Sequence, residues 1–328
     1  MPLYRLEAMF AEEGVVISRY VMSMWMIKLA EAFKPLYECM IQRLRSSGYV
    51  HMDETILQVL REIGRLASSD SRMWVMCSDQ KSESSPVAVF HYSPTRSASV
   101  IRDLLGSDFK GYLQSDDYAG YECYANQYED VIHVLCWDHA RRKFWDAFQA
   151  INKDKRKNST SDQVLNLIKK LYRVESRAKE LQLSEKEVLE MRTKESIPIL
   201  DKLKKLVEAK QPNLSESSPT YKAINYLLSN WDLLLLYTTD GRLNISNSPA
   251  EQRIRPFAIG RKAWLFSNTA RGAEASAIIY SIVETAKLNG LVPGEYIRDT
   301  LKALATHDPS RIAELLPSKT KTNDIKST

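Results

Sequence analysis

The order of strand-like and helical segments is the feature that most constrains the fold of this chain. Apolar, β-branched and aromatic runs predict three consecutive strands, at residues 49–60, 72–77 and 86–92, with a polar turn at 78–85 before the third. One helix follows, and then two shorter strands with helices between them; these are expected at 97–105, 111–115 and 131–136. This order predicts an α/β fold with a mixed sheet and helices on its faces.

The rest of the chain reads as helical. Residues 1–46 hold two helical stretches separated by Gly14, and Ser18 is placed to cap the second. This is the outline of a helix-turn-helix, with two ordinary packed helices as the alternative. Residues 151–243 have helical periodicity and serine capping signals, and we interpret them as an inserted helical block. Residues 309–328 are polar and charged, and we expect them to be disordered.

Composition permits a nucleic-acid partner without requiring one. The 328 residues carry a formal net charge of +5 and a pI of about 8.8. No apolar run is long enough for a membrane span, and no signal peptide is visible, so we expect a cytoplasmic protein. The cysteines form no CxxC pair, which argues against a zinc site or a disulfide framework; they are Cys39, Cys77, Cys123 and Cys136.

Three acidic residues stand in settings suited to a shared metal site. Asp53 and Asp116 lie in or at the end of predicted strands, and Glu251 lies in the first turn of a predicted helix. Carboxylates gathered from distant segments of a basic chain are what two-metal phosphoryl transfer on nucleic acid needs. Each has a structural alternative: a solvent-facing strand residue for Asp53, turn chemistry for Asp116, and a capping box with Ser248 for Glu251. By pattern alone, Asp117 could replace Asp116.

Two basic clusters accompany these acids. Guanidinium groups match phosphate geometry, and an aromatic side chain among them can stack on an unpaired base. Each cluster alone has a solvated helix face as its alternative. Together, beside the acidic residues, they favour a held phosphate backbone. One cluster spans residues 139–145, and the other contains Arg253, Arg255, Arg261, Lys262 and Arg271 with Trp264 and Phe266.

Several motifs, in one order along the chain, resemble those of the insertion-sequence-66 family of bacterial DDE transposases. They are found at residues 51–55, 72–75, 113–121, 136–144, 247–256, 259–266 and 280–290. The resemblance implies an RNase H-like fold with a helical insertion before the last catalytic acid. It also selects Asp116 as the family acid, since Asp117 stands where the family more often has glycine.

The resemblance implies Mg²⁺-dependent DNA strand cleavage and strand transfer, with two Mg²⁺ ions and Mn²⁺ as an alternative. The catalytic and metal-binding residues would be Asp53, Asp116 and Glu251. The DNA-binding residues expected from charge and context are His139, Arg142, Lys143, Arg255, Arg261 and Lys262. The expected domains are a helical segment 1–46, a catalytic core in two parts 47–150 and 244–308, the insertion 151–243 and the tail 309–328.

The expected partners are the DNA of the element ends and of the target, a second copy of the chain on DNA, and accessory proteins encoded by the element; no membrane is expected. Family members usually carry an N-terminal region with a leucine-rich segment and a cysteine zinc motif, which this sequence does not show. We therefore keep two alternatives: an inactive transposase that only binds DNA or a partner, and a related RNase H-like nuclease acting on another nucleic acid.

Overall fold

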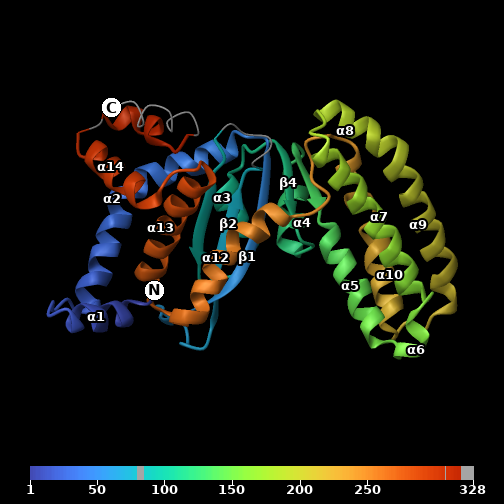
Figure 1. Ribbon diagram of the computed structural model, residues 1–328, viewed down its shortest axis with the longest axis horizontal. Coiled ribbons are helices and arrows are strands. Elements are labelled where there is room, and N and C mark those ends of the chain that lie inside the picture. The colour runs from blue at the N-terminus through green and yellow to red at the C-terminus, as the bar shows by residue number, and fades with distance from the viewer. Residues whose placement is uncertain (80–84, 307, 319–328) are drawn as a thin grey trace. The chain divides into compact units, whose positions relative to one another are not determined.

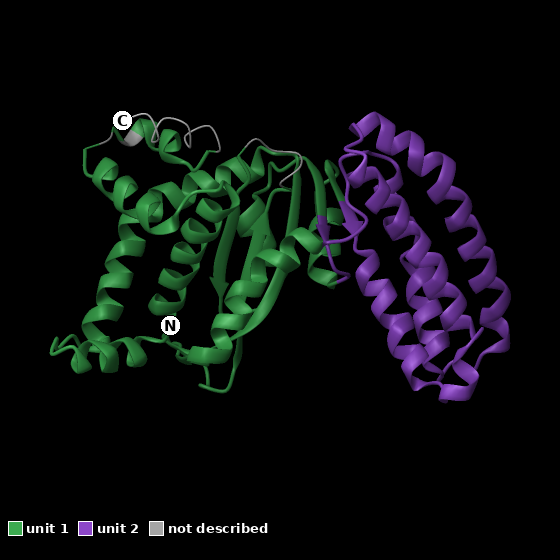
Figure 2. Cartoon of the chain, in the orientation of Figure 1, with its two compact units in different colours: residues 1–113, 118–132, 248–328 green, residues 114–117, 133–247 purple. Residues whose placement is uncertain are grey.

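The computed structural model describes residues 1–79, 85–306 and 308–318 (Figure 1). Most of the polar turn expected at 78–85 and the last ten residues of the expected tail lie outside these ranges. The chain divides into two compact units (Figure 2). Unit 1 comprises residues 1–113, 118–132 and 248–328, and unit 2 comprises residues 114–117 and 133–247.

Unit 1 holds most of a mixed sheet with its covering helices. Its elements are α1 (Leu3–Glu12), α2 (Arg19–Arg45), β1 (Tyr49–Arg61), β2 (Asp70–Cys77), β3 (Ala88–Ser93), α3 (Ala98–Leu105), α4 (Ala119–Gln127), α12 (Ser248–Trp264), β6 (Ser267–Thr269), α13 (Ala270–Leu288), α14 (Pro293–Leu304) and the 3₁₀ helix η4 (Pro309–Leu315). The unit boundary passes through β4 (Gly111–Ser115) and β5 (Val131–Leu135). Every strand predicted from the sequence is present, within two residues at each end.

The strand order is β3-β2-β1-β4-β5, and β6 pairs with β1. The first three strands are antiparallel neighbours, whereas β6 runs parallel to β1. Helices lie on both faces of the sheet (Figure 1). The predicted mixed sheet with flanking helices is therefore confirmed.

The two faces of β1 bury different residues because successive side chains of a strand point to opposite sides. Met52 belongs to the core cluster that contains Phe33 of α2 and Ile101 of α3. Leu57 belongs to the opposite cluster, with Ile254 of α12. Each fully buried side chain of this size contributes about 1.5–3 kcal/mol relative to exposure. A shift of β1 by one residue would exchange the two apolar sets, so its register is strongly specified.

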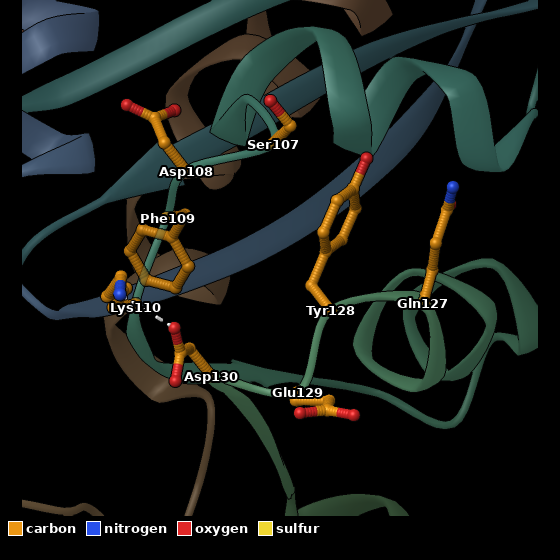
Figure 3. Close-up of a pocket in the computed structure, with 8 residues that line it drawn as sticks. All are labelled: Ser107, Asp108, Phe109, Lys110, Gln127, Tyr128, Glu129 and Asp130. Carbon is orange, nitrogen blue, oxygen red and sulfur yellow. Dashed lines mark ion pairs between the residues drawn. The ribbon is translucent and has the colours of Figure 1, made fainter.

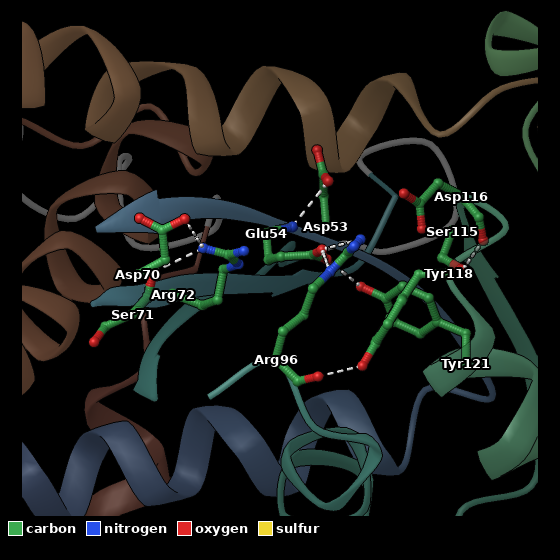
Figure 4. A network of polar contacts seen from close by, with 10 residues as sticks. All are labelled: Asp53, Glu54, Asp70, Ser71, Arg72, Arg96, Ser115, Asp116, Tyr118 and Tyr121. Atoms are coloured by element: carbon green, nitrogen blue, oxygen red, sulfur yellow. Dashed lines mark hydrogen bonds and ion pairs between the residues drawn. The ribbon is translucent and has the colours of Figure 1, made fainter. Parts of the chain in front are cut away.

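An ion pair between the buried Glu54 carboxylate and the exposed Arg96 adds to this constraint. The Glu54 side chain is 6% exposed, and its Oε1 atom lies 2.5 Å from Nη2 of Arg96. Tyr121 donates a hydrogen bond to Glu54 Oε2 at 3.1 Å, and the Arg96 guanidinium covers the Tyr118 ring at 3.9 Å. Figure 4 shows the carboxylates of Glu54 and Asp53 pointing to opposite sides of the strand. The pair thus holds Asp53 on the face that α12 covers.

The N-terminal helices form as predicted. Gly14 has φ +75°, and the Ser18 side chain accepts the Val21 N–H at 3.3 Å to cap α2. Helix α2 buries Phe33 and Met40 in the core of the sheet layer. Its C-terminal half therefore serves as a packed helix, and the helix-turn-helix stays a prediction.

Unit 2 is helical after its strand residues. Its elements are α5 (Trp137–Ala150), α6 (Lys153–Arg156), α7 (Thr160–Glu180), α8 (Glu185–Met191), the π-helix η1 (Arg192–Ser196), α9 (Ile197–Lys210), the 3₁₀ helix η2 (Gln211–Asn213), α10 (Pro219–Ser229), α11 (Trp231–Leu235) and the 3₁₀ helix η3 (Leu236–Thr238). Ser184 forms the predicted capping box with Glu187, and Ser218 caps α10. Helix α5, which precedes the helical block expected at 151–243, packs with α7 and α10 and belongs to the same unit.

One buried guanidinium organises the end of unit 2. Arg192 makes a two-pronged bond to Glu175, at 2.8 and 2.7 Å. It also donates to the backbone oxygens of Tyr237, Asp240 and Leu243. The segment 237–243, which follows the last helices of unit 2, is therefore held by a side chain from η1. Each of these three carbonyl oxygens accepts a hydrogen bond from a charged donor.

Disorder was expected from residue 309, and this is wrong for the first part of the tail. Residues Pro309–Leu315 form η4, and Leu316 is buried in the cluster that contains Phe33. Ile312 and Leu315 pack against the same cluster. These apolar side chains, spaced through a polar segment, supply the burial that orders it.

Within the ranges that the structure describes, no helix is both long and apolar enough to cross a membrane.

We predict that Arg96→Met destabilises the fold by about 2–4 kcal/mol, because it leaves the buried Glu54 carboxylate without its counter-ion. Chemical denaturation of the full chain measures this. Arg102→Met, at an exposed position of α3, serves as the matched control and should change stability by less than about 0.5 kcal/mol. In the double variant Glu54→Gln/Arg96→Met, part of the loss should be recovered; strictly additive effects would contradict the coupling.

Candidate functional site

Asp53 lies in the middle of β1, opposite Val75 of β2, and not at a strand end. It is half-buried, and its Oδ1 atom accepts the Glu54 N–H at 2.8 Å. By strand alternation it shares a face with Thr55 and Leu57. Thr55 Oγ1 accepts a hydrogen bond from Arg261 of α12 at 3.2 Å, which confirms that α12 covers this face. Asp53 is therefore a strand acid aimed at a helix and not at open solvent.

Glu251 lies in the first turn of α12, as predicted. Its Oε1 atom is buried and has no hydrogen-bond partner among the described residues. A buried carboxylate oxygen without a donor is unfavourable unless a cation or ordered water satisfies it. Hard oxygen ligands of this kind suit Mg²⁺. The buried Oε1 atom therefore leaves room for a cation or an ordered water beside Glu251.

Asp116 belongs to unit 2 and follows β4. The Ser115 hydroxyl donates to the Asp116 carbonyl oxygen at 2.8 Å and lies 2.8 Å from Nε2 of His133 on β5. Burial lowers the pKa of His133 to about 4, although the neighbouring Asp116 opposes the shift. A neutral imidazole and a serine thus hold the backbone from which the Asp116 carboxylate extends; Figure 4 shows Ser115 beside Asp116. Asp116 is half-buried, whereas Asp117 is exposed.

Helix α10 supplies the other surroundings of these two acids. Burial raises the pKa of Tyr226, and the carboxylates of Asp117 and Asp116 raise it further. The Lys143 ammonium lies 4.3 Å from the centre of the Tyr226 ring. Within unit 2, then, Lys143 and Tyr226 stand beside the predicted acid.

The predicted DNA-binding residues of α5 differ in exposure. Arg142 and Lys143 are exposed, as a phosphate contact requires. His139 is half-buried, and its Nδ1 atom finds no hydrogen-bond partner in the part of the chain that is described. Nearby, Trp145 is exposed and stacks on Phe148 at 5.8 Å.

The predicted residues of α12 also differ. Arg255 and Lys262 are exposed, while Arg261 is partly buried by its bond to Thr55. Trp264, expected to offer a stacking surface, is only partly buried, and its stacking role stays a prediction. Its ring packs edge-on against Phe257 at 5.3 Å, beside the core cluster beneath α12. The aromatic of this segment that remains exposed is Phe266.

Asp79, a buried acid just after β2, was not predicted as a site residue. Burial raises the pKa of the neighbouring Cys77 to about 12; Arg253 lowers it, and Asp79 and Asp53 raise it. These three charged side chains therefore surround one thiol of unit 1. The available signal was an acid directly following a predicted strand, the same signal that pointed to Asp116.

The two cavities that stand out lie elsewhere in unit 1. One, of about 280 Å³, is bounded by the Lys110–Asp130 ion pair of 2.8 Å (Figure 3). The other, of about 590 Å³, is lined by residues of α2, β3, α3 and α13, including Tyr37 and His91. Neither contains a predicted catalytic or DNA-binding residue, so the candidate chemistry does not depend on them.

Comparison with known proteins gives one consistent answer. Residues 1–275 match the family model described as Transposase IS66 family, and residues 281–318 match that of the IS66 C-terminal element. Among curated proteins of Sinorhizobium fredii, the chain is 30% identical to the uncharacterized protein y4qI over 97% of its length, and 28% identical to y4hP over 96%. It spans 59% and 58% of those two proteins.

We predict that His133 makes stability depend on pH between about 7 and 4. Its folded pKa is depressed, so the unfolded chain takes up the proton first and stability falls as pH falls. The loss from pH 7.5 to 4.5 should be about 2–3 kcal/mol larger in the parent chain than in His133→Gln. Urea unfolding at the two pH values measures it, and other titrating groups cancel in the comparison. Equal losses in both proteins would exclude His133 as the source.

Proposed function

Because the chain belongs to the IS66 family of transposases, we propose that it carries the catalytic centre of a DDE transposase, which cleaves DNA strands and joins them to a target. Asp53, Asp116 and Glu251 would be the three carboxylates of that centre. The observation that carries the proposal is the buried Glu251 Oε1 atom without a hydrogen-bond partner among the described residues. Glu251 lies on α12, and Asp53 faces this helix from β1. A buried carboxylate oxygen without a donor is suited to bind a cation.

The strand pattern supports an RNase H-like catalytic fold. Three antiparallel strands come first, and β4 follows β1 in the strand order. In this reading β1 carries the first acid near its centre, the loop after β4 carries the second, and α12 carries the third. The helices of unit 2 intervene in the chain between the second and third acids, which suits an insertion.

Two Mg²⁺ ions, or Mn²⁺, would activate the attacking water or 3′-hydroxyl and stabilise the leaving oxygen of the phosphodiester. The protein's own part is to hold the three carboxylates in fixed positions. Glu54 does not compete for this role, because Arg96 and Tyr121 hold it on the opposite face of β1. His133 and Ser115 fix the backbone at Asp116, so that its side chain starts from a defined position.

The basic residues of α5 and α12 would hold the DNA backbone. Exposure supports Arg142, Lys143, Arg255 and Lys262 as phosphate contacts. Arg261 is already bonded to Thr55, so it would orient the segment as well as contact DNA. His139 lies on α5, and with its buried Nδ1 atom it would act at the inner side of that helix. A second copy of the chain and accessory proteins encoded by the element remain expected partners.

We predict that Asp53→Asn, Asp116→Asn and Glu251→Gln each lower Mg²⁺-dependent nicking of element-end duplex DNA by roughly 10³-fold or more, because the three act as one unit. Circular dichroism and urea unfolding should show an intact fold. Glu122→Gln, at an exposed position of α4, is the matched control and should keep full activity. Asp117→Asn decides between the adjacent acids: it should retain activity if Asp116 is the ligand.

The same assay separates the alternatives. If the parent chain nicks no DNA with Mg²⁺ or Mn²⁺ yet binds it with steep salt dependence, the chain is a binding module and the catalytic proposal fails. If it cleaves RNA–DNA hybrid in preference to duplex DNA, it is a nuclease of the related kind. Near-parental activity in any one acid variant removes that residue from the centre.

A further inference from the structure

The loop that joins β1 to β2 carries the most exposed large apolar side chain of the described residues. Ile63 is fully exposed, and Leu66 in the same loop is 76% exposed. Full exposure of an isoleucine is unfavourable in water, and such side chains often mark a contact surface when they lie together. The two residues form the tip of a hairpin, which we call the hairpin tip (residues 62–69).

The hairpin tip is held in place from within. The Glu62 side chain is 4% exposed; it accepts hydrogen bonds from Ser71 and Tyr92 and forms a 2.8 Å ion pair with Arg65. Arg65 also donates to the Asp70 carbonyl oxygen at 3.0 Å. A buried carboxylate with three partners keeps the loop from collapsing, so that Ile63 stays directed into solvent.

A further tie and a supporting strand make the base of the hairpin rigid. Gln58 Nε2 donates to the Ala67 carbonyl oxygen at 2.9 Å. Strand β6 pairs with the last residues of β1, Val59 with Ser267 and Arg61 with Thr269. Gly64 has φ +73°, a conformation that suits glycine in the turn. An exposed apolar tip on a rigid two-stranded base is suited to insert into a partner molecule, because the base prevents the tip from folding back onto the sheet.

The charges around the hairpin tip favour an anionic partner. Arg61 is exposed at its base, and the carboxylate of Glu62 is buried and paired. No residue from 63 to 69 is acidic, and the exposed carboxylate of Asp70, which follows, is paired with Arg72 at 3.7 Å. Because β6 pairs with β1, the end of α12 and the residues before β6 also lie near the hairpin. They carry the exposed side chains of Lys262 and Phe266. An acidic protein surface could pair with Arg61, but its polar side chains would make no favourable contact with Ile63. A DNA duplex offers both phosphates for Arg61 and apolar base faces for Ile63.

We propose that the hairpin tip enters bound duplex DNA as a wedge, with Ile63 inserted at a base step, Leu66 beside it and Arg61 on the adjacent phosphate. The width of a two-stranded ribbon suits a DNA groove, and inserted apolar side chains partly unstack a base step and kink the duplex. The inference rests on the proposed function for its DNA substrate. It adds a distortion of the bound DNA that the three carboxylates do not provide.

Fluorescence of 2-aminopurine tests the wedge without any cleavage. Element-end duplexes of equal length, each with the probe at one position, are titrated with the full chain in EDTA. The parent chain should raise the fluorescence several-fold at one or two adjacent positions. Ile63→Ser should abolish the rise while weakening binding by less than about 10-fold, and Leu66→Ser should reduce it. Arg61→Ala should lower the salt slope of binding by about one ion.

Leu181→Ser is the matched control, since Leu181 is an exposed leucine of unit 2, and it should leave the rise unchanged. Binding by the parent chain with no rise at any position, or a full rise in Ile63→Ser, would overturn the wedge. So would sedimentation showing that Ile63→Ser dissolves a dimer formed without DNA, because the tip would then be a protein contact. A rise without nicking in Mg²⁺ would leave the wedge standing and count against the catalytic proposal alone.

Discussion

The ion pair between Glu54 and Arg96 is the interaction on which the candidate site depends. Two acids stand side by side on β1, and alternation sends them to opposite faces. Arg96 and Tyr121 receive the carboxylate of Glu54 on one face, so the pair adds a polar preference for this register. Tyr121 and the ring of Tyr118 complete the surroundings of the pair. Asp53 is thereby left to face α12.

Helix α12 completes this arrangement through packing more than through charge. Ile254 and Phe257 bury its underside against β1 and β2, and Trp264 closes the far end against Phe257. The helix is consequently rigid from its first turn, where Glu251 lies. The unsatisfied Glu251 oxygen is a local departure from good hydrogen bonding, and departures of this kind are concentrated at functional sites. The packing that stabilises the fold thus also fixes the position of the proposed metal ligand.

Much of the fold could be predicted from the sequence, and the failures have physical causes. Strands β1 to β5 and the capped helices α2, α8 and α10 were predicted because their signals are local: apolar patterning and serine caps. Strand β6 was missed, since three polar residues have no pattern and pair only because β1 extends beside them. The ordered η4 was missed because its few apolar residues find a core built by the opposite end of the chain. For the site, the three acids were identified by residue type and sequence setting, while Asp79 was overlooked.

The sequence by itself determined the order of the elements, the family and the residue types able to offer oxygen ligands. The tertiary structure alone decided which of the two adjacent acids Asp53 and Glu54 faces α12, that Trp264 packs against Phe257, and that a buried Glu251 oxygen has no donor among the described residues. The reason is the separation of the partners along the chain. Arg96 lies 42 residues from Glu54, and Arg261 lies 206 residues from Thr55, so no local pattern could encode either contact.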